Sequence, residues 1–128
     1  MPVEKVLLMR DVAQSLLEIA QNAHPREMLM LLRGRKKKDV LEIDEILFAP
    51  LSRHDEHSAF FRFDMLPLDF TIIGLAHSHP SGDPHPSDED LYHFIGNIML
   101  ILTPPYLTLE DIHAYNSKGD RVKVFLKG

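Results

Sequence analysis

The feature that most limits the possible folds of this chain is an apolar run that ends in two histidines. Residues 70–76 are strongly apolar and partly β-branched, which is typical of a buried central strand. The run leads directly into His77, Ser78 and His79, and a segment rich in proline and glycine follows up to Pro86. Ser87 then precedes a stretch that can form a helix. The chain is therefore expected to bring a strand end, a tight loop and a helix start together.

The residues of this segment are suited to binding a metal ion. Two histidines separated by one residue on an extended segment project to the same side, so His77 and His79 can bind one ion. Ser87 is a favourable N-cap for a helix that we expect to run to about residue 97. Asp90 would lie one turn into that helix, on the same face as Ser87. Two imidazoles and one carboxylate leave a tetrahedral zinc with one open position for water, whose pKa such a site lowers to about 7.

Hydrolytic chemistry also needs a general base and a group that stabilises the oxyanion. Ser87 is a candidate for the second task. Glu27 stands at the start of the apolar segment 28–32, just after the end of a predicted helix. A carboxylate there could reach the end of a neighbouring strand and act as the base, or it could be a surface acid that follows a helix. The residues alone leave both interpretations open.

Composition restricts the chemistry further. The 128 residues contain no cysteine, which excludes cysteine-based zinc modules and the Cys-x-x-Cys signature of zinc deaminases. The net charge of −5 argues against a broad nucleic-acid surface, and the basic run over residues 33–38 is expected to be a solvated turn. There is no basic leader and no apolar window of the ~18 residues that a membrane helix needs. We therefore expect one cytoplasmic domain over residues 1–128, with no membrane or nucleic-acid partner.

The remaining pattern predicts an α/β fold in which a mixed, mostly antiparallel sheet is flanked by two main helices. Asp11 is expected to cap a first helix that ends at His24, before Pro25. A hairpin turn is expected over residues 116–120. The expected strands cover residues 3–9, 28–32, 40–43, 46–48, 70–76, 98–102, 111–115 and 122–126.

Other histidines and aromatic residues receive different roles. As a fourth ligand, His85 would close the open position on the metal, so we expect it to be an exposed loop residue. His54 and His57 are expected in a mobile loop that helps to dock substrate. The phenylalanines of residues 60–63 are expected to contribute mainly to the core.

At this point the chain resembles a known family. The run from His77 to Pro80, followed by Ser87 and Asp90, resembles the JAMM motif of the JAB/MPN (MPN+) zinc metalloproteases. Residues 24–27 and 31–34 resemble the glutamate segment of that family. The resemblance covers nearly the whole chain and implies the cytidine-deaminase-like JAB/MPN fold. The short connector between residues 102 and 111 is similar to that of compact archaeal and bacterial members.

The resemblance implies a role for each site residue. His77, His79 and Asp90 would bind Zn²⁺, Glu27 would hold the catalytic water and transfer its proton, and Ser87 would stabilise the oxyanion. The implied activity is cleavage after the C-terminal glycine of ubiquitin or of ubiquitin-like proteins, including sulfur carriers. An extended Gly-Gly tail would then add to a sheet edge beside the zinc. Compact relatives often form homodimers, although the sequence identifies no interface.

Two other functions stay open. Residues 80–84 resemble the loop of RadC-like proteins linked to DNA repair, although the acidic balance and the missing helical DNA-binding extension count against this function. The other is a non-enzymatic interaction module with a structural zinc, which would normally have four protein ligands instead of three.

Overall fold

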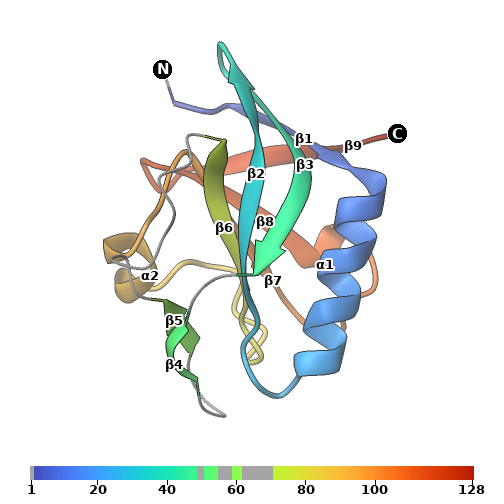
Figure 1. The fold of residues 1–128 in the computed structure, drawn as a ribbon, viewed down its shortest axis with the longest axis vertical. Helices are drawn as coiled ribbons and strands as arrows, with labels where there is room; N and C mark the ends of the chain where they lie inside the picture. Colours follow the sequence, from blue (N-terminus) through green and yellow to red (C-terminus); the bar gives the residue numbers. More distant parts are fainter. Residues whose placement is uncertain (1, 49–50, 55–58, 62–70) are drawn as a thin grey trace.

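The computed structural model describes residues 2–48, 51–54, 59–61 and 71–128, and over these residues the chain forms nine strands and two α-helices (Figure 1). The helices are α1 (Arg10–Ala23) and α2 (Asp88–Tyr92), with a short 3₁₀ helix η2 (Leu109–Asp111). The strands are β1 (Lys5–Met9), β2 (Leu29–Lys37), β3 (Val40–Phe48), β4 (Leu51–His54), β5 (Ala59–Phe61), β6 (Ile72–Ser78), β7 (Ile98–Leu102), β8 (Ile112–Asn116) and β9 (Arg121–Lys127).

The main sheet closes on itself in the order β1-β3-β2-β6-β7-β8-β9, because β1 pairs with β3 on one side and with β9 on the other. These two pairings and the pairing of β6 with β7 are parallel, and the other pairings in the sheet are antiparallel. β4 and β5 form a separate antiparallel pair. The predicted mixed, mostly antiparallel sheet is confirmed, whereas its closure into a barrel was not predicted.

The two helices lie on opposite sides of the sheet (Figure 1), and the core is correspondingly divided into two apolar clusters. α1 contributes Val12, Leu16 and Ala20 to the larger cluster, as the helical spacing of its apolar residues requires. The smaller cluster lies on the other face of the central strands, where Phe94 and Ile95 pack just after α2. Among the described residues, no helix is both long enough and apolar enough to cross a membrane.

Both helices differ in detail from the prediction. Asp11 does not cap α1, because the helix already begins at Arg10 and Asp11 lies in its first turn, where its carboxylate accepts from the N–H of Val12 (2.8 Å). α2 ends at Tyr92, well short of residue 97. The chain has to turn back beside β6 here, and Gly96 makes that turn with a φ of +71° against the carbonyl of Ile73. A side chain at this position would be strained and would collide with that carbonyl.

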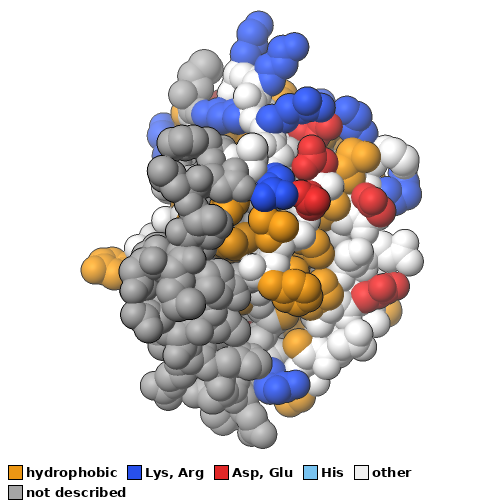
Figure 2. Space-filling view, in the orientation of Figure 1, with side chains coloured by type: hydrophobic (Ala, Val, Ile, Leu, Met, Phe, Trp, Pro, Cys, Tyr) orange, Lys and Arg blue, Asp and Glu red, His pale blue; other side chains and the backbone are white. Residues whose placement is uncertain are grey.

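The basic run over residues 33–38 was predicted to be a solvated turn, and this prediction was wrong, because most of the run lies in β2. β2 continues through Gly34 to Lys37, and Lys38 follows in the turn to β3. Gly34 does not end the strand, because it sits at a bulge where a Cβ atom would collide with the Glu42 carbonyl of β3. Figure 2 shows Lys and Arg side chains gathered at the top of the view, over the tip of this β2–β3 hairpin.

Candidate metal centre

The end of β6 holds the two predicted histidine ligands. β6 lies between β2 and β7, and His77 is paired with Leu29 on one side and Ile101 on the other, which leaves it 6% exposed. His79 follows the end of the strand, and its N–H donates to the carbonyl of Leu102 (2.8 Å). The ring centroids of the two histidines are 4.9 Å apart. The prediction that both rings project to the same side is confirmed.

The start of α2 brings a carboxylate to the same place. Ser87 caps the helix as predicted, since its Oγ accepts from the N–H of Asp90 (3.0 Å) and the Asp90 Oδ2 accepts from the N–H of Ser87 (2.8 Å). This capping box orients Asp90, whose Oδ2 is 3.0 Å from the Nε2 of His79 and whose Oδ1 is 3.6 Å from the Nε2 of His77. One potential ligand atom from each of these three residues lies within 4.8 Å of the others.

Two features of the imidazoles show that this cluster fits a metal ion. The Nε2 of His77 is buried and has no hydrogen-bond partner in the described part of the chain, which is rare for a buried polar atom. The Nδ1 of His79 lies 2.9 Å from the carbonyl of Asp83 and donates to it, so that Nε2 is the atom available as a ligand. Two imidazole nitrogens and a carboxylate oxygen are ligands that Zn²⁺ accepts, and three of them leave one position open.

In the metal-free cluster, the pKa values of the two histidines are shifted in opposite directions. Burial lowers the pKa of His77 to about 4, against the opposing charge of Asp90. Burial also lowers the pKa of His79, but the hydrogen bonds to Asp90 and Asp83, together with the charges of Asp90 and Glu27, outweigh it and hold this pKa above the usual 6.5. Burial raises the pKa of Asp90, but the His79 hydrogen bond and the neighbouring histidines hold it well below its usual value. A proton on His79 therefore occupies the place of the metal.

We expect zinc affinity to fall as the pH drops, because binding must release this proton from His79. His77 remains neutral down to a pKa of about 4, so only one proton competes above that value. From about pH 5 up to the raised pKa of His79, the logarithm of the zinc Kd should fall by about one unit per pH unit. Competition against a chromogenic chelator measures this slope, and a flat profile would contradict the protonated His79–Asp90 pair.

Glu27 lies two residues before the start of β2, near this cluster. The register between β2 and β6 reaches the pair of Leu29 and His77, and Glu27 and His79 each lie two residues beyond that pair. The N–H of Met28 donates to the Oγ of Ser78 (2.8 Å), and the N–H of Ser78 donates to the carbonyl of Met28 (3.2 Å). Glu27 is half-buried, and its charge contributes to the raised pKa of His79. Sequence reasoning missed this link between the hydroxyl of Ser78 and the segment that carries Glu27.

None of the other histidines whose side chains the structure describes is part of the cluster. His85 is exposed, as predicted, and its Nδ1 is bonded to the Oδ1 of Asp83 (2.9 Å). His57 lies outside the described residues, as does the side chain of His54, so the predicted docking role of these histidines stays a prediction. The same holds for the core role predicted for the phenylalanines of residues 60–63.

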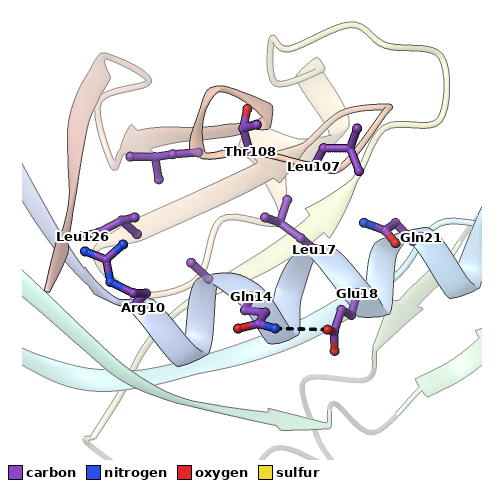
Figure 3. Close-up of a pocket in the computed structure, with 10 residues that line it drawn as sticks. Arg10, Gln14, Leu17, Glu18, Gln21, Leu107, Thr108 and Leu126 are labelled. Carbon is purple, nitrogen blue, oxygen red and sulfur yellow. Dashed lines mark hydrogen bonds between the residues drawn. The ribbon is translucent and has the colours of Figure 1, made fainter. Parts of the chain in front are cut away.

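A pocket elsewhere on the molecule is separate from the metal centre. It lies between α1 and the segment that follows β7 (Figure 3), and the hydrogen bond between Gln14 and Glu18 (3.4 Å) runs along its rim. None of the predicted site residues lines it. Its lining residues are Arg10, Ala13, Gln14, Leu17, Glu18, Gln21, Leu107, Thr108, Leu109 and Leu126.

Solved structures share this fold. A JAB1/MPN domain protein from Archaeoglobus fulgidus is 32% identical in sequence, with a TM-score of 0.70 over 95% of this chain and 99% of that one. A second structure, described as JAMM, a metalloprotease-like zinc site in the proteasome and signalosome, is 30% identical, with a TM-score of 0.65 over the full length of both chains. Fold and site together therefore define a domain of the JAB/MPN class with a three-residue group that could hold a metal ion.

Sequence comparison identifies the family within this class. The model of the prokaryotic homologues of the JAB domain matches residues 9–118, and this chain belongs to that family. A probable metalloprotease of Haloferax volcanii is 34% identical over 124 residues, which cover 91% of this chain and 76% of the relative. A UPF0758 protein of Moorella thermoacetica is 37% identical over 82 residues, or 64% of this chain, but only 35% of that protein's length is matched. Zinc is the cofactor that His77, His79 and Asp90 would hold.

Proposed function

We propose that this chain is a zinc-dependent peptidase or isopeptidase that cleaves after the C-terminal glycine of ubiquitin or of a ubiquitin-like protein of the sulfur-carrier type. The observation that carries the proposal is the buried, unpartnered Nε2 of His77, which lies with His79 and Asp90 in the geometry of an open three-ligand site. Zinc, when bound there, would supply hydroxide at neutral pH and polarise the carbonyl of the substrate.

Glu27 would act as the general base and then as the general acid. Its carboxylate would accept the proton of the attacking water and deliver it to the leaving nitrogen, which is a lysine Nζ or a peptide amide of the substrate. The position of Glu27 near His79 supports this role, because the two hydrogen bonds between Met28 and Ser78 hold the segment before β2 against the end of β6. A carboxylate held in this way needs little reorganisation to reach the reacting atoms.

Ser87 would stabilise the oxyanion that forms at the substrate carbonyl. Its Oγ accepts a hydrogen bond from the N–H of Asp90, so the hydroxyl proton remains available for donation. The capping box holds this hydroxyl next to the ligand Asp90. A donor fixed before the reaction is the arrangement that stabilises developing negative charge most effectively.

The recessed position of the ligands supports a substrate with a narrow tail. The side chains of His77, His79 and Asp90 are only 8%, 14% and 19% exposed. The two glycines that end ubiquitin-like proteins carry no side chain, so the scissile carbonyl of such a tail can approach ligands at this depth.

The proposal is tested with two substrates at equal concentration: an isopeptide conjugate of a ubiquitin-like protein and a sulfur carrier with a C-terminal extension. Mass spectrometry should show a newly exposed C-terminal glycine from at least one substrate, and a chelator should stop the reaction until zinc is added back. A matched substrate with valine in place of the last glycine should react much more slowly. Unchanged turnover in the chelated sample, or no cleavage of either substrate, would contradict the proposal.

The two other functions receive less support. A structural zinc site normally has four protein ligands, and the described residues bring only three together. A RadC-like function has the match to the UPF0758 protein in its favour, but that match covers about a third of the relative. Salt-dependent binding to duplex DNA, without turnover of either protein substrate, would favour the RadC-like function. A cytoplasmic location and a homodimer stay predictions.

A further inference from the structure

The loop that joins the two halves of the metal centre, residues 80–86, is held to the sheet by a tyrosine. Within the loop, the N–H of Gly82 donates to the carbonyl of His79 (3.0 Å), and the N–H of His85 donates to the Oδ1 of Asp83 (3.0 Å). The hydroxyl of Tyr115, in β8, donates to the carbonyl of Pro84 (2.5 Å). This bond connects the loop to a strand that contributes none of the ligands.

The residue that Tyr115 holds is adjacent to the one that orients a zinc ligand. The carbonyl of Asp83 accepts the hydrogen bond from the Nδ1 of His79 (2.9 Å), and Pro84 follows directly. Proline fixes its own φ, so only the ψ angle of Pro84 can rotate between the Asp83–Pro84 peptide and the Pro84 carbonyl. Fixing the Pro84 carbonyl therefore limits how the Asp83 carbonyl can turn.

Tyr115 is itself fixed firmly enough to serve this purpose. Its side chain is 3% exposed in the smaller apolar cluster, on the face of the sheet that carries His77. The guanidinium of Arg121 lies 5.8 Å from the centre of the Tyr115 ring and donates to the Nδ1 of His113 (2.8 Å). Burial raises the pKa of Tyr115, so its hydroxyl keeps the proton that it donates.

We infer that Tyr115 is a positioning residue of the zinc centre. By holding Pro84, it keeps the Asp83 carbonyl directed at the Nδ1 of His79, and this leaves the Nε2 of His79 directed at the metal. Loss of an outer contact of this kind typically weakens metal binding by about 10- to 100-fold. The inference concerns the metal centre and does not depend on which bond the protein cleaves.

The test is Tyr115→Phe, which removes only the hydroxyl. Its matched control is Thr103→Val, which also removes a buried hydroxyl from the same region but leaves the loop contact intact. Competition with a chromogenic chelator should give a zinc Kd about 10-fold higher for Tyr115→Phe and unchanged for Thr103→Val. The metal-free forms of both variants should lose a similar, small amount of thermal stability, because each loses one buried hydrogen bond.

A second measurement reports on His79 directly. In zinc-saturated protein, long-range ¹H–¹⁵N spectra should show the Nδ1–H of His79 as a sharp signal in the wild type and in Thr103→Val, and a weakened, exchange-broadened signal in Tyr115→Phe. A wild-type Kd together with a sharp signal in Tyr115→Phe would overturn the inference. Equal losses of zinc affinity in both variants would also overturn it, because the effect would then follow from general destabilisation.

Discussion

Replacing Asp90 with asparagine is expected to lower zinc affinity by roughly a hundredfold. A zinc site that binds with about 12 kcal/mol through three protein ligands gains about 4 kcal/mol from each, or about three factors of ten in Kd, and the amide oxygen of asparagine, a weaker ligand than a carboxylate, keeps part of this gain. Asparagine keeps an oxygen that can accept from the N–H of Ser87, so the start of α2 should remain formed. Zinc titration by chelator competition measures the loss, and circular dichroism of the metal-free protein checks that the fold is retained.

Asp88→Asn is the matched control for this variant. Asp88 lies in the same first turn of α2, is exposed and is not part of the metal cluster. Both substitutions remove one negative charge from the same short helix, so a general electrostatic effect would lower zinc affinity in both. An equal loss in the two variants, or wild-type affinity in Asp90→Asn, would show that Asp90 is not a ligand.

Replacing Glu27 with glutamine is expected to remove turnover and to leave the zinc bound. Glutamine has nearly the same shape but cannot accept the proton of the attacking water, and a general base typically contributes about 10²- to 10⁴-fold to the rate. The affinity for the substrate and the Kd for zinc should change little, so kcat should fall while KM stays nearly the same. Single-turnover cleavage of the preferred substrate, with metal content measured in the same samples, gives both quantities.

Glu18→Gln serves as the control, because Glu18 is an exposed glutamate of α1 that lies outside the metal cluster. Loss of zinc in Glu27→Gln would assign Glu27 as a fourth ligand instead of the base. Turnover by Glu27→Gln at the wild-type rate, with zinc bound, would falsify its role in proton transfer.

The site could be predicted where it depends on residues close together in the sequence. The shared direction of His77 and His79 follows from the geometry of an extended strand, and the N-cap role of Ser87 follows from local backbone rules. The role of Glu27 required the resemblance to a family, since sequence spacing does not show that β2 pairs with β6. The fixed position of that residue depends on Ser78, whose hydroxyl bond to Met28 crosses between the two strands.

The parts that were predicted wrongly depend on contacts between distant segments. The length of α2 is set by the return of the chain to β6 at Gly96, and the path of β2 is set by the close approach of β3 at Gly34. Helical and strand propensities contain no information about either contact. Tyr115 was missed for the same reason, because its local sequence indicates an ordinary strand and its bond to Pro84 spans 31 positions in the sequence.

The closure of the main sheet restricts how any other chain can join it. Each of its seven strands has a hydrogen-bonded neighbour on both sides, but not along its whole length, because β3 pairs with β1 only over residues 40–43 and its residues 45–48 pair with β2 alone. A Gly-Gly tail can therefore pair with this sheet only along such a stretch, and among the described strands the β4–β5 pair also has open sides. The same closure limits edge-to-edge aggregation, and a homodimer that shares a sheet would have to pair along one of these short stretches.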